Sequence, residues 1–353
     1  MPRSLSPIRR ELGAVIARVL GVPADAVQVS APPSRLEPHL DLVVRASGFS
    51  FLVQIKERGG AGEVASAISR VQQRSGRRSS RREIPLIVVR FMGETGRDLC
   101  DRAGLAWLDL SGNARIVAPG LRIDIQGRPN RSQRRGRPAN LFAPKSSRLS
   151  RQLLLAAEEP HSQKEIAEAT GLGPGYVSRI AHRLEEDGLV VRNENGAIRP
   201  RDPALLLDAW RERYRFEDHS IRRGHVPARS GEDLQRRLTQ AFEANRIPYA
   251  ATGLGAAWLL SRFATFRLVT IYLPEGAGGE VLDAVGFRDE ERGGNVWLVE
   301  PNDEGVMHGS QEVEGIRCVS PIQVYLDLTG HPERSAEAAE RLREDLLIGL
   351  RHA

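Results

Sequence analysis

The sequence from Ser162 to Arg199 reads SQKEIAEATGLGPGYVSRIAHRLEEDGLVVRNENGAIR and decides how the middle of the chain folds. Ser162 is followed three residues later by Glu165, which is the spacing of a reciprocal N-terminal capping box. The segment GLGPG then ends this first helix, because its glycines interrupt helical structure and Pro174 favours the first turn of a new helix. The pattern therefore predicts two helices separated by a tight turn.

The second of these helices is expected to be amphipathic. Its apolar residues follow the i, i+3, i+4, i+7 spacing of one buried helix face, and they are Val177, Ile180, Ala181 and Leu184. The opposite face carries side chains that can reach DNA phosphates and base edges, namely Tyr176, Ser178, Arg179, His182 and Arg183.

A β-hairpin is predicted directly after this helix. Gly188 ends the helix, and the segments LVVR and AIR then flank the turn sequence NENG. Two helices followed by a hairpin form a winged helix-turn-helix, so we expect double-stranded DNA as the partner, with Arg192 of the hairpin as a further contact. Some winged helices bind only protein, and in that alternative Arg179 and Arg183 belong to a solvated face.

Length and composition set the frame around this motif. A chain of 353 residues is expected to hold two or three domains. Two cysteines support neither a disulfide framework nor a zinc site. The sequence contains no signal-peptide pattern and no apolar run of membrane-spanning length. We therefore expect a soluble, cytoplasmic protein without a membrane partner.

Charge is distributed unevenly along the chain. Residues 1–145 contain 25 Lys and Arg against 12 Asp and Glu, residues 146–216 contain 11 of each kind, and residues 217–353 contain 15 against 22. The basic part is expected to meet a polyanion, and the acidic part is expected to meet protein or the basic part itself.

Composition and pattern predict four segments. They are an α/β domain over residues 1–126, a basic linker over 127–145, the winged helix over 146–216 and a C-terminal α/β domain over 231–353. Residues 217–230 are polar, and an irregular segment is expected there. In the linker, Arg135 and Arg137 belong to an R-G-R-P sequence, the core of an AT-hook, which inserts its arginines into the minor groove of A·T tracts. A generic basic contact with DNA is the alternative.

The first domain contains residues in the arrangement of a nuclease site. Asp41 begins a predicted strand, and Gln54 and Lys56 lie on one face of the next strand. This arrangement resembles the PD-(D/E)xK restriction-endonuclease fold. The resemblance implies that Asp41 and Gln54 hold Mg²⁺ and that Lys56 adds positive charge at the phosphoryl transition state. In this alternative function, the protein is a DNA endonuclease that its winged helix targets and that acts in phage defence.

Gln54 departs from that pattern, because most members have a glutamate at this position. An amide brings no charge, so Mg²⁺ affinity should fall, although the Mrr-type branch resembles this Q-x-K variant. Two alternatives are a nuclease domain that has lost activity and an ion pair between Asp41 and Lys56. A cluster of arginines after the motif suits a phosphate backbone, and it consists of Arg70, Arg74, Arg77, Arg78, Arg81 and Arg82.

The C-terminal part carries a second resemblance, in the segments YAATGLGAAWLLSRFATFRLVTIYLPE, NVWLVEPNDEGVMHG and VSPIQVYLDLTGHPERSAEAAERLRE. Together with the winged helix, they resemble the AbiEi-type antitoxins and regulators of type IV toxin-antitoxin systems. The resemblance implies a repressor of its own operon and a cognate toxin protein as a partner. A toxin neutraliser that binds protein, with DNA binding as a secondary property, is the alternative. A homodimer on a palindromic site is the default expectation for a winged helix.

The same C-terminal segments faintly resemble a nucleotidyltransferase, with a glycine-rich turn at 252–255, a helix and a strand. The strand from Arg267 to Tyr272 lacks the acidic residues that such an enzyme needs, so the domain is expected to be non-catalytic. The expected fold class is thus α+β multidomain: a restriction-endonuclease-like α/β domain, a winged helix-turn-helix and a degenerate nucleotidyltransferase-like α/β domain. No cofactor is expected, except Mg²⁺ if the nuclease-like site is active.

Overall fold

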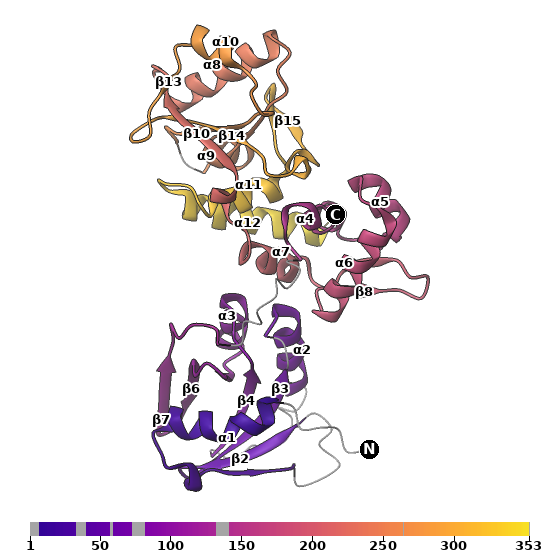
Figure 1. Cartoon of the computed structure of the whole chain (residues 1–353), viewed down its shortest axis with the longest axis vertical. Coiled ribbons are helices and arrows are strands. Elements are labelled where there is room, and N and C mark those ends of the chain that lie inside the picture. Colours follow the sequence, from indigo (N-terminus) through magenta and orange to yellow (C-terminus); the bar gives the residue numbers. More distant parts are fainter. Residues whose placement is uncertain are drawn as a thin grey trace. The chain divides into compact units, whose positions relative to one another are not determined.

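The computed structural model describes residues 7–32, 40–56, 59–72, 82–131, 141–263 and 265–352. Within these residues the chain divides into two compact units. The first comprises Met1–Pro138 with Glu185–Leu189, and the second comprises Ala139–Leu184 with Val190–Ala353 (Figure 1). Helices and sheets are both present in each unit, so the fold is α+β with several domains.

The first unit is built on a seven-stranded sheet whose spatial order follows the sequence. Strands β3, β4 and β5 are parallel to one another, and the remaining neighbours are antiparallel. The strands are β1 (Gln28–Ser30), β2 (Leu42–Ala46), β3 (Phe49–Lys56), β4 (Glu83–Val89), β5 (Ala106–Asp109), β6 (Ala114–Ala118) and β7 (Leu121–Ile125). The helices are α1 (Pro7–Leu20), the short 3-10 helix η1 (Ala24–Ala26), α2 (Ala61–Gln72) and α3 (Glu94–Arg102).

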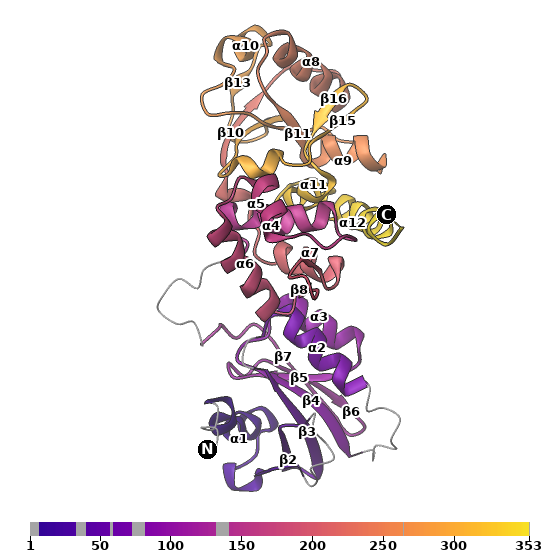
Figure 2. The same ribbon diagram turned by 90° about the vertical axis from the view of Figure 1, so that its right-hand side faces the viewer.

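Helices cover both faces of this sheet (Figure 2). One core cluster joins α1 to alternate strand residues such as Val53 and Val88, and the other joins α2 and α3 to Ile87 and Trp107. Residues 86–89 of β4 are therefore fully buried, which explains the uninterrupted apolar sequence LIVV of that central strand.

The second unit begins with the winged helix-turn-helix. Its elements are α4 (Pro144–Leu155), α5 (Gln163–Thr170), α6 (Pro174–Glu186), β8 (Val190–Arg192) and β9 (Ile198–Pro200), followed by α7 (Pro203–Arg211). The capping box predicted at Ser162 and Glu165 is present, with both reciprocal hydrogen bonds. Gly171 ends α5 in the left-handed conformation, at a φ of 65°, which glycine adopts without the steric cost that a Cβ atom adds.

A second seven-stranded sheet follows, with the spatial order β13-β10-β14-β12-β11-β16-β15. Its strands are β10 (Ser220–His225), β11 (Ala250–Thr252), β12 (Val269–Tyr272), β13 (Arg288–Asp289), β14 (Val296–Glu300), β15 (Gln311–Val313) and β16 (Ile316–Cys318). The accompanying helices are η2 (Phe216–Asp218), α8 (Gly231–Ala244), α9 (Gly253–Ser261), α10 (Gly279–Ala284), η3 (Glu304–Met307), α11 (Pro321–Leu328) and α12 (Ser335–His352). None of the helices in the described part of the chain is long and apolar enough to cross a bilayer.

The expectation of an irregular segment at residues 217–230 was wrong. Residues 220–225 form β10, which pairs antiparallel with β14 on one side and β13 on the other. The strand is polar because cross-strand partners hold its side chains: Arg222 forms an ion pair with Asp289, and Arg223 lies over the ring of Trp297. Such pairs stabilise a sheet without apolar alternation.

Two arginines of α4 connect the winged helix to the C-terminal sheet domain. Arg148 donates through Nε and Nη2 to the carboxylate of Asp303, at 2.7 and 2.8 Å, and through Nη1 to the carbonyl of Thr170. Arg151 is fully buried and donates to the side-chain oxygen of Gln323. The winged helix and this sheet therefore belong to one packed body.

Gln323 leads into a buried polar cluster centred on Asp327. The carboxylate of Asp327 accepts hydrogen bonds from four side chains, which are Tyr214, Thr252, Tyr272 and Gln323. Burial raises the pKa of Asp327 to about 6, while the four donors act in the opposite direction. The cluster supplies the hydrogen bonds that a buried carboxylate requires.

Candidate nucleic-acid interface

Helix α6 presents two distinct faces. The predicted stripe of Val177, Ile180, Ala181 and Leu184 is buried in the winged helix. Ser178, Arg179 and His182 are exposed, and Tyr176 and Arg183 are half-buried. The side chains expected to contact DNA thus lie on the opposite side from the core.

Tyr176 differs from the other residues of this face. Its hydroxyl lies 2.7 Å from the hydroxyl of Ser146 on α4. Two cations flank its ring, with the guanidinium carbon of Arg179 at 5.3 Å and Nζ of Lys145 at 5.9 Å from the ring centroid. Because its hydroxyl already has a protein partner, the geometry favours Tyr176 as a support for these cations over a direct reader of bases.

Lys145 was expected in the linker, but α4 begins at Pro144, so Lys145 lies in the first turn of that helix. The residue before the helix, Ala143, provides no side-chain cap. The N-terminus of α4 therefore adds a cation and uncapped N–H groups next to Tyr176, an arrangement that attracts phosphate. The proline at the first helical position was the sequence signal that would have placed this helix start.

In the wing, Arg192 has a structural contact. Its Nη1 donates to the carbonyl of Gly196 at 2.8 Å, and the side-chain oxygen of Asn193 accepts from two backbone N–H groups of the same turn. Arg199, which the sequence analysis did not single out, is exposed on β9 between the buried residues Ile198 and Pro200. Strand alternation from Ile198 was the signal that could have identified it.

The R-G-R-P sequence with Arg135 and Arg137 lies outside the described residues. Of the arginine cluster after the nuclease-like motif, Arg70 and Arg82 are described, and both are exposed. The other four arginines also lie outside the described residues.

The three nuclease-like residues lie at β2 and β3 of the first unit. Asp41 accepts a hydrogen bond from the backbone N–H of Ile55 at 2.8 Å, so its carboxylate is beside the Gln54–Lys56 segment. Its other oxygen pairs with Arg9 of α1 at 3.3 Å. Burial, followed by the charge of Arg70, lowers the pKa of Lys56, whereas Glu63 and Asp41 oppose that shift.

Gln54 is only 2% exposed, and its side-chain oxygen has no hydrogen-bond partner among the described residues. A buried amide oxygen without a donor is unusual and is a possible ligand for a hard cation. However, Arg9 competes for Asp41, and no group of three or more His, Cys, Asp or Glu side chains within the described residues could hold a metal. Asp41 and Gln54 would offer Mg²⁺ one carboxylate, which also pairs with Arg9, and one uncharged amide oxygen. This is a weak set of ligands for the ion.

Part of the winged helix is similar to a known protein family. Residues 152–197 match the model of the MarR family. The match begins within α4 and runs through α5, α6 and β8 to the last residue before β9. It supports a DNA-binding transcriptional regulator. No curated protein and no solved structure matched the chain.

Proposed function

We propose that this protein is a transcriptional regulator of antitoxin type, which binds a specific double-stranded DNA sequence and represses its own operon. The observation that carries the proposal is the outward face of α6 within a segment that matches the MarR family. In this proposal, Ser178, Arg179, His182 and Arg183 enter the major groove, and Lys145, Arg192 and Arg199 contact phosphates.

A homodimer on a palindromic operator is part of the proposal, because one winged helix covers few base pairs. A cognate toxin protein as partner is the other part, and it rests on the resemblance of the C-terminal segments to AbiEi-type antitoxins. Arg135 and Arg137 would extend the contact into the minor groove.

An electrophoretic mobility-shift assay on the DNA upstream of the gene tests this function. The Arg179→Gln/Arg183→Gln variant is expected to lose at least about tenfold in affinity, because each charge-assisted hydrogen bond to DNA contributes about 1.5–3 kcal/mol. A matched control is Arg236→Gln, an exposed arginine on α8 of the same unit. If wild type and the double variant bind DNA equally well, α6 is not the helix that recognises DNA.

The salt dependence of the same assay separates specific from non-specific binding. The logarithm of affinity should fall with the logarithm of salt concentration by about 0.9 for each phosphate neutralised. Operator DNA should remain preferred over scrambled DNA at each salt concentration. Loss of that preference would reduce the protein to a non-specific DNA binder.

A Mg²⁺-dependent endonuclease is the second candidate, and the buried, unpartnered oxygen of Gln54 beside Asp41 is the observation that favours it. If Mg²⁺ binds, Asp41 and Gln54 would hold it, and the ion would supply activation of water and charge at the phosphate. Incubation with supercoiled plasmid and Mg²⁺ or Mn²⁺ tests this. Nicking that disappears in Lys56→Ala supports the nuclease, and an intact plasmid with both metals excludes it.

A further inference from the structure

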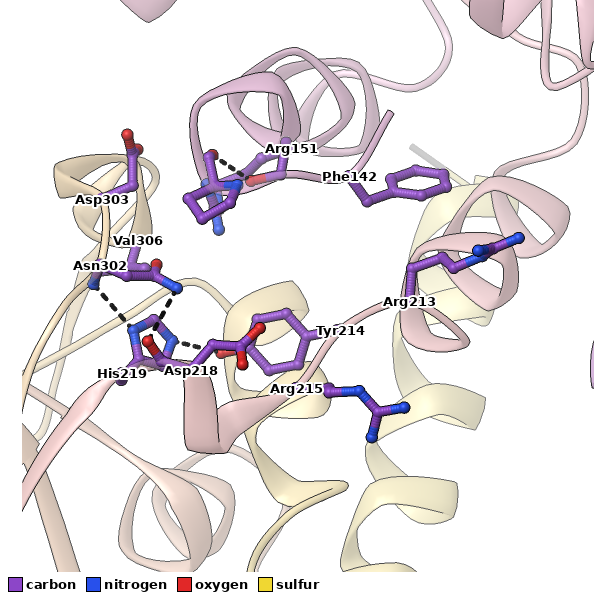
Figure 3. Close-up of a pocket in the computed structure, with 12 residues that line it drawn as sticks. Phe142, Arg151, Arg213, Tyr214, Arg215, Asp218, His219, Asn302, Asp303 and Val306 are labelled. Atoms are coloured by element: carbon purple, nitrogen blue, oxygen red, sulfur yellow. Dashed lines mark hydrogen bonds between the residues drawn. The ribbon is translucent and has the colours of Figure 1, made fainter. Parts of the chain in front are cut away.

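A small cavity lies where the winged helix packs against the C-terminal sheet domain (Figure 3). Its volume is about 50 Å³, and its walls come from α4 and the residue Phe142 before it, from the segment between α7 and β10, and from η3 with the loop that leads into it. All of its lining residues lie outside the segment 152–197 that matches the MarR family. The cavity is therefore a feature of how this chain joins its domains.

Arg151 forms one wall of the cavity and is the main reason to expect a ligand there. The residue is only 2% exposed, and its hydrogen-bond and ring contacts are uncharged: the side-chain oxygen of Gln323 and the ring of Trp210, whose centroid is 5.0 Å away. The carboxylates of Asp327 and Asp303 attract it without a hydrogen bond to it. Its Nε has no hydrogen-bond partner among the described residues. Because a buried cationic N–H without an acceptor is costly, Nε of Arg151 is suited to an anion.

Two aspartates also line the cavity, but one of them is neutralised. The carboxylate of Asp303 is held by Arg148, which donates to both of its oxygens. Asp218 is exposed, and Arg213 and Arg215 are exposed close to it in the sequence. Burial lowers the pKa of His219, another lining residue, to about 4, so this ring is neutral at pH 7. The lining charges thus leave a positive excess.

The N-terminus of α4 contributes a second attraction for an anion. Pro144 and Ser147 of its first turn line the cavity, and Ala143 provides no side-chain cap for this twelve-residue helix. The free N–H groups and the helix dipole make such a terminus favourable for phosphate. Arg151 lies two turns further along the same helix, so both features act on one small space.

We propose that this cavity binds the phosphoryl group of a small metabolite and that its occupancy changes the affinity for DNA. One water occupies about 30 Å³ in the liquid, so the cavity has room for a compact oxyanion, with the rest of the ligand outside. Arg213 and Arg215 point away from the cavity in Figure 3, and their exposed side chains would turn toward the bound phosphate.

The link to DNA rests on the proposed function and runs through two adjacent serines of α4. Ser147 lines the cavity, and the hydroxyl of Ser146 bonds to the hydroxyl of Tyr176 on α6. A ligand that draws the first turn of α4 toward the cavity also moves Lys145 of that turn, which lies beside the Tyr176 ring together with Arg179, so the cations that face DNA are displaced. Binding at one site thereby alters the population of the DNA-competent arrangement at the other.

Calorimetric titration of the full chain with inorganic phosphate and, separately, with 5′-AMP tests the site without DNA. Sodium chloride of matched ionic strength is the blank. We expect saturable binding of at least one probe, weakened about tenfold in Arg213→Gln/Arg215→Gln. Tighter binding of 5′-AMP would identify a phosphomonoester, and equal or tighter binding of phosphate would identify the free ion.

The control variant is Arg236→Gln/Arg288→Gln, which removes two exposed arginines of the same unit that do not line the cavity. It should bind both probes as wild type does. Arg151→Met, whose fold is checked by its thermal melting curve, should abolish binding. Absence of saturable binding, or equal weakening by the control variant, overturns the proposal.

The mobility-shift assay with and without the bound probe tests the coupling. A DNA affinity that changes severalfold with the probe, and not in Arg213→Gln/Arg215→Gln, supports it, and an unchanged affinity refutes it. If Arg213→Gln/Arg215→Gln weakens DNA binding without any probe, the cavity binds a phosphate of the DNA backbone. The proposal of a metabolite site then fails. Because the titration contains no DNA, failure of the proposed function and failure of the anion site are distinguishable.

Discussion

Arg148 and Asp303 are 155 residues apart in the sequence, and their side chains form a two-point ion pair between α4 and the loop before η3. Both side chains are largely buried, with 14% and 11% exposed. The pair is further fixed because Asp303 also accepts from the backbone N–H of Gly305, and Arg148 also reaches Glu304. It therefore holds the winged helix to the C-terminal sheet domain.

Breaking this pair is expected to destabilise the protein. Arg148→Met leaves the carboxylate of Asp303 buried without its cation, which should lower the free energy of unfolding by about 3 kcal/mol. Urea denaturation of the full chain measures it. In a double-mutant cycle, adding Asp303→Asn should cost less than it does alone. Additive losses would show that the two side chains are not coupled.

Ser162→Ala removes the acceptor at the N-terminus of α5. The expected loss is about 1 kcal/mol, because the N–H of Glu165 loses its capping oxygen. Chemical denaturation measures the loss, and Ser178→Ala in the middle of α6, where the serine is exposed, is the matched control. The prediction fails if the two substitutions change stability equally.

Two substitutions at Tyr176 separate a support from a base contact. Tyr176→Phe keeps the ring and removes only the hydroxyl that bonds to Ser146, so DNA affinity should stay within about threefold of wild type. Tyr176→Ala removes the ring that Lys145 and Arg179 flank, and affinity should fall about tenfold. A large loss in Tyr176→Phe, with an intact melting curve, would instead make the hydroxyl a DNA contact.

His219 should make stability depend on pH. Burial lowers its pKa to about 4, so between pH 6.5 and 4 the unfolded chain binds a proton that the folded chain does not. The contribution is present above pH 6.5 and is lost as the pH falls toward 4, by up to about 3 kcal/mol. Asp327, with its pKa raised to about 6, acts in the opposite direction, because its folded form takes up the proton first.

The comparison with His219→Gln isolates the histidine from Asp327, since Asp327 titrates in both proteins. Denaturation at pH 7 and pH 4.5 should show wild type losing about 2–3 kcal/mol more than the variant over this interval. Parallel losses in the two proteins would mean that His219 is protonated in the folded state.

Local pattern accounts for the parts of the site that the sequence predicted. The capping box at Ser162, the helix end at Gly171 and the buried stripe of α6 each depend on residues within about two turns of one another. Such features are recognisable because near neighbours decide them.

Strands that form through pairing with distant segments could not be predicted from the local sequence. Residues 220–225 have no apolar alternation, and they became a strand because β14 and β13 lie on either side of them. Gln54 could be placed on a face of β3 from the sequence, but its lack of a partner depends on packing from elements far along the chain. Lys145 was placed in the linker because the start of α4 has no side-chain cap.

The sequence by itself determined the winged helix and the outward cationic face of α6, because hydrogen bonds and side-chain contacts over a few residues select those conformations. Only the tertiary structure decided that Arg148 meets Asp303, that Arg151 is buried beside Gln323 and that a cavity opens between them and η2. The two side-chain contacts join residues 155 and 172 positions apart, and all three features form only when two domains pack, which no local pattern encodes.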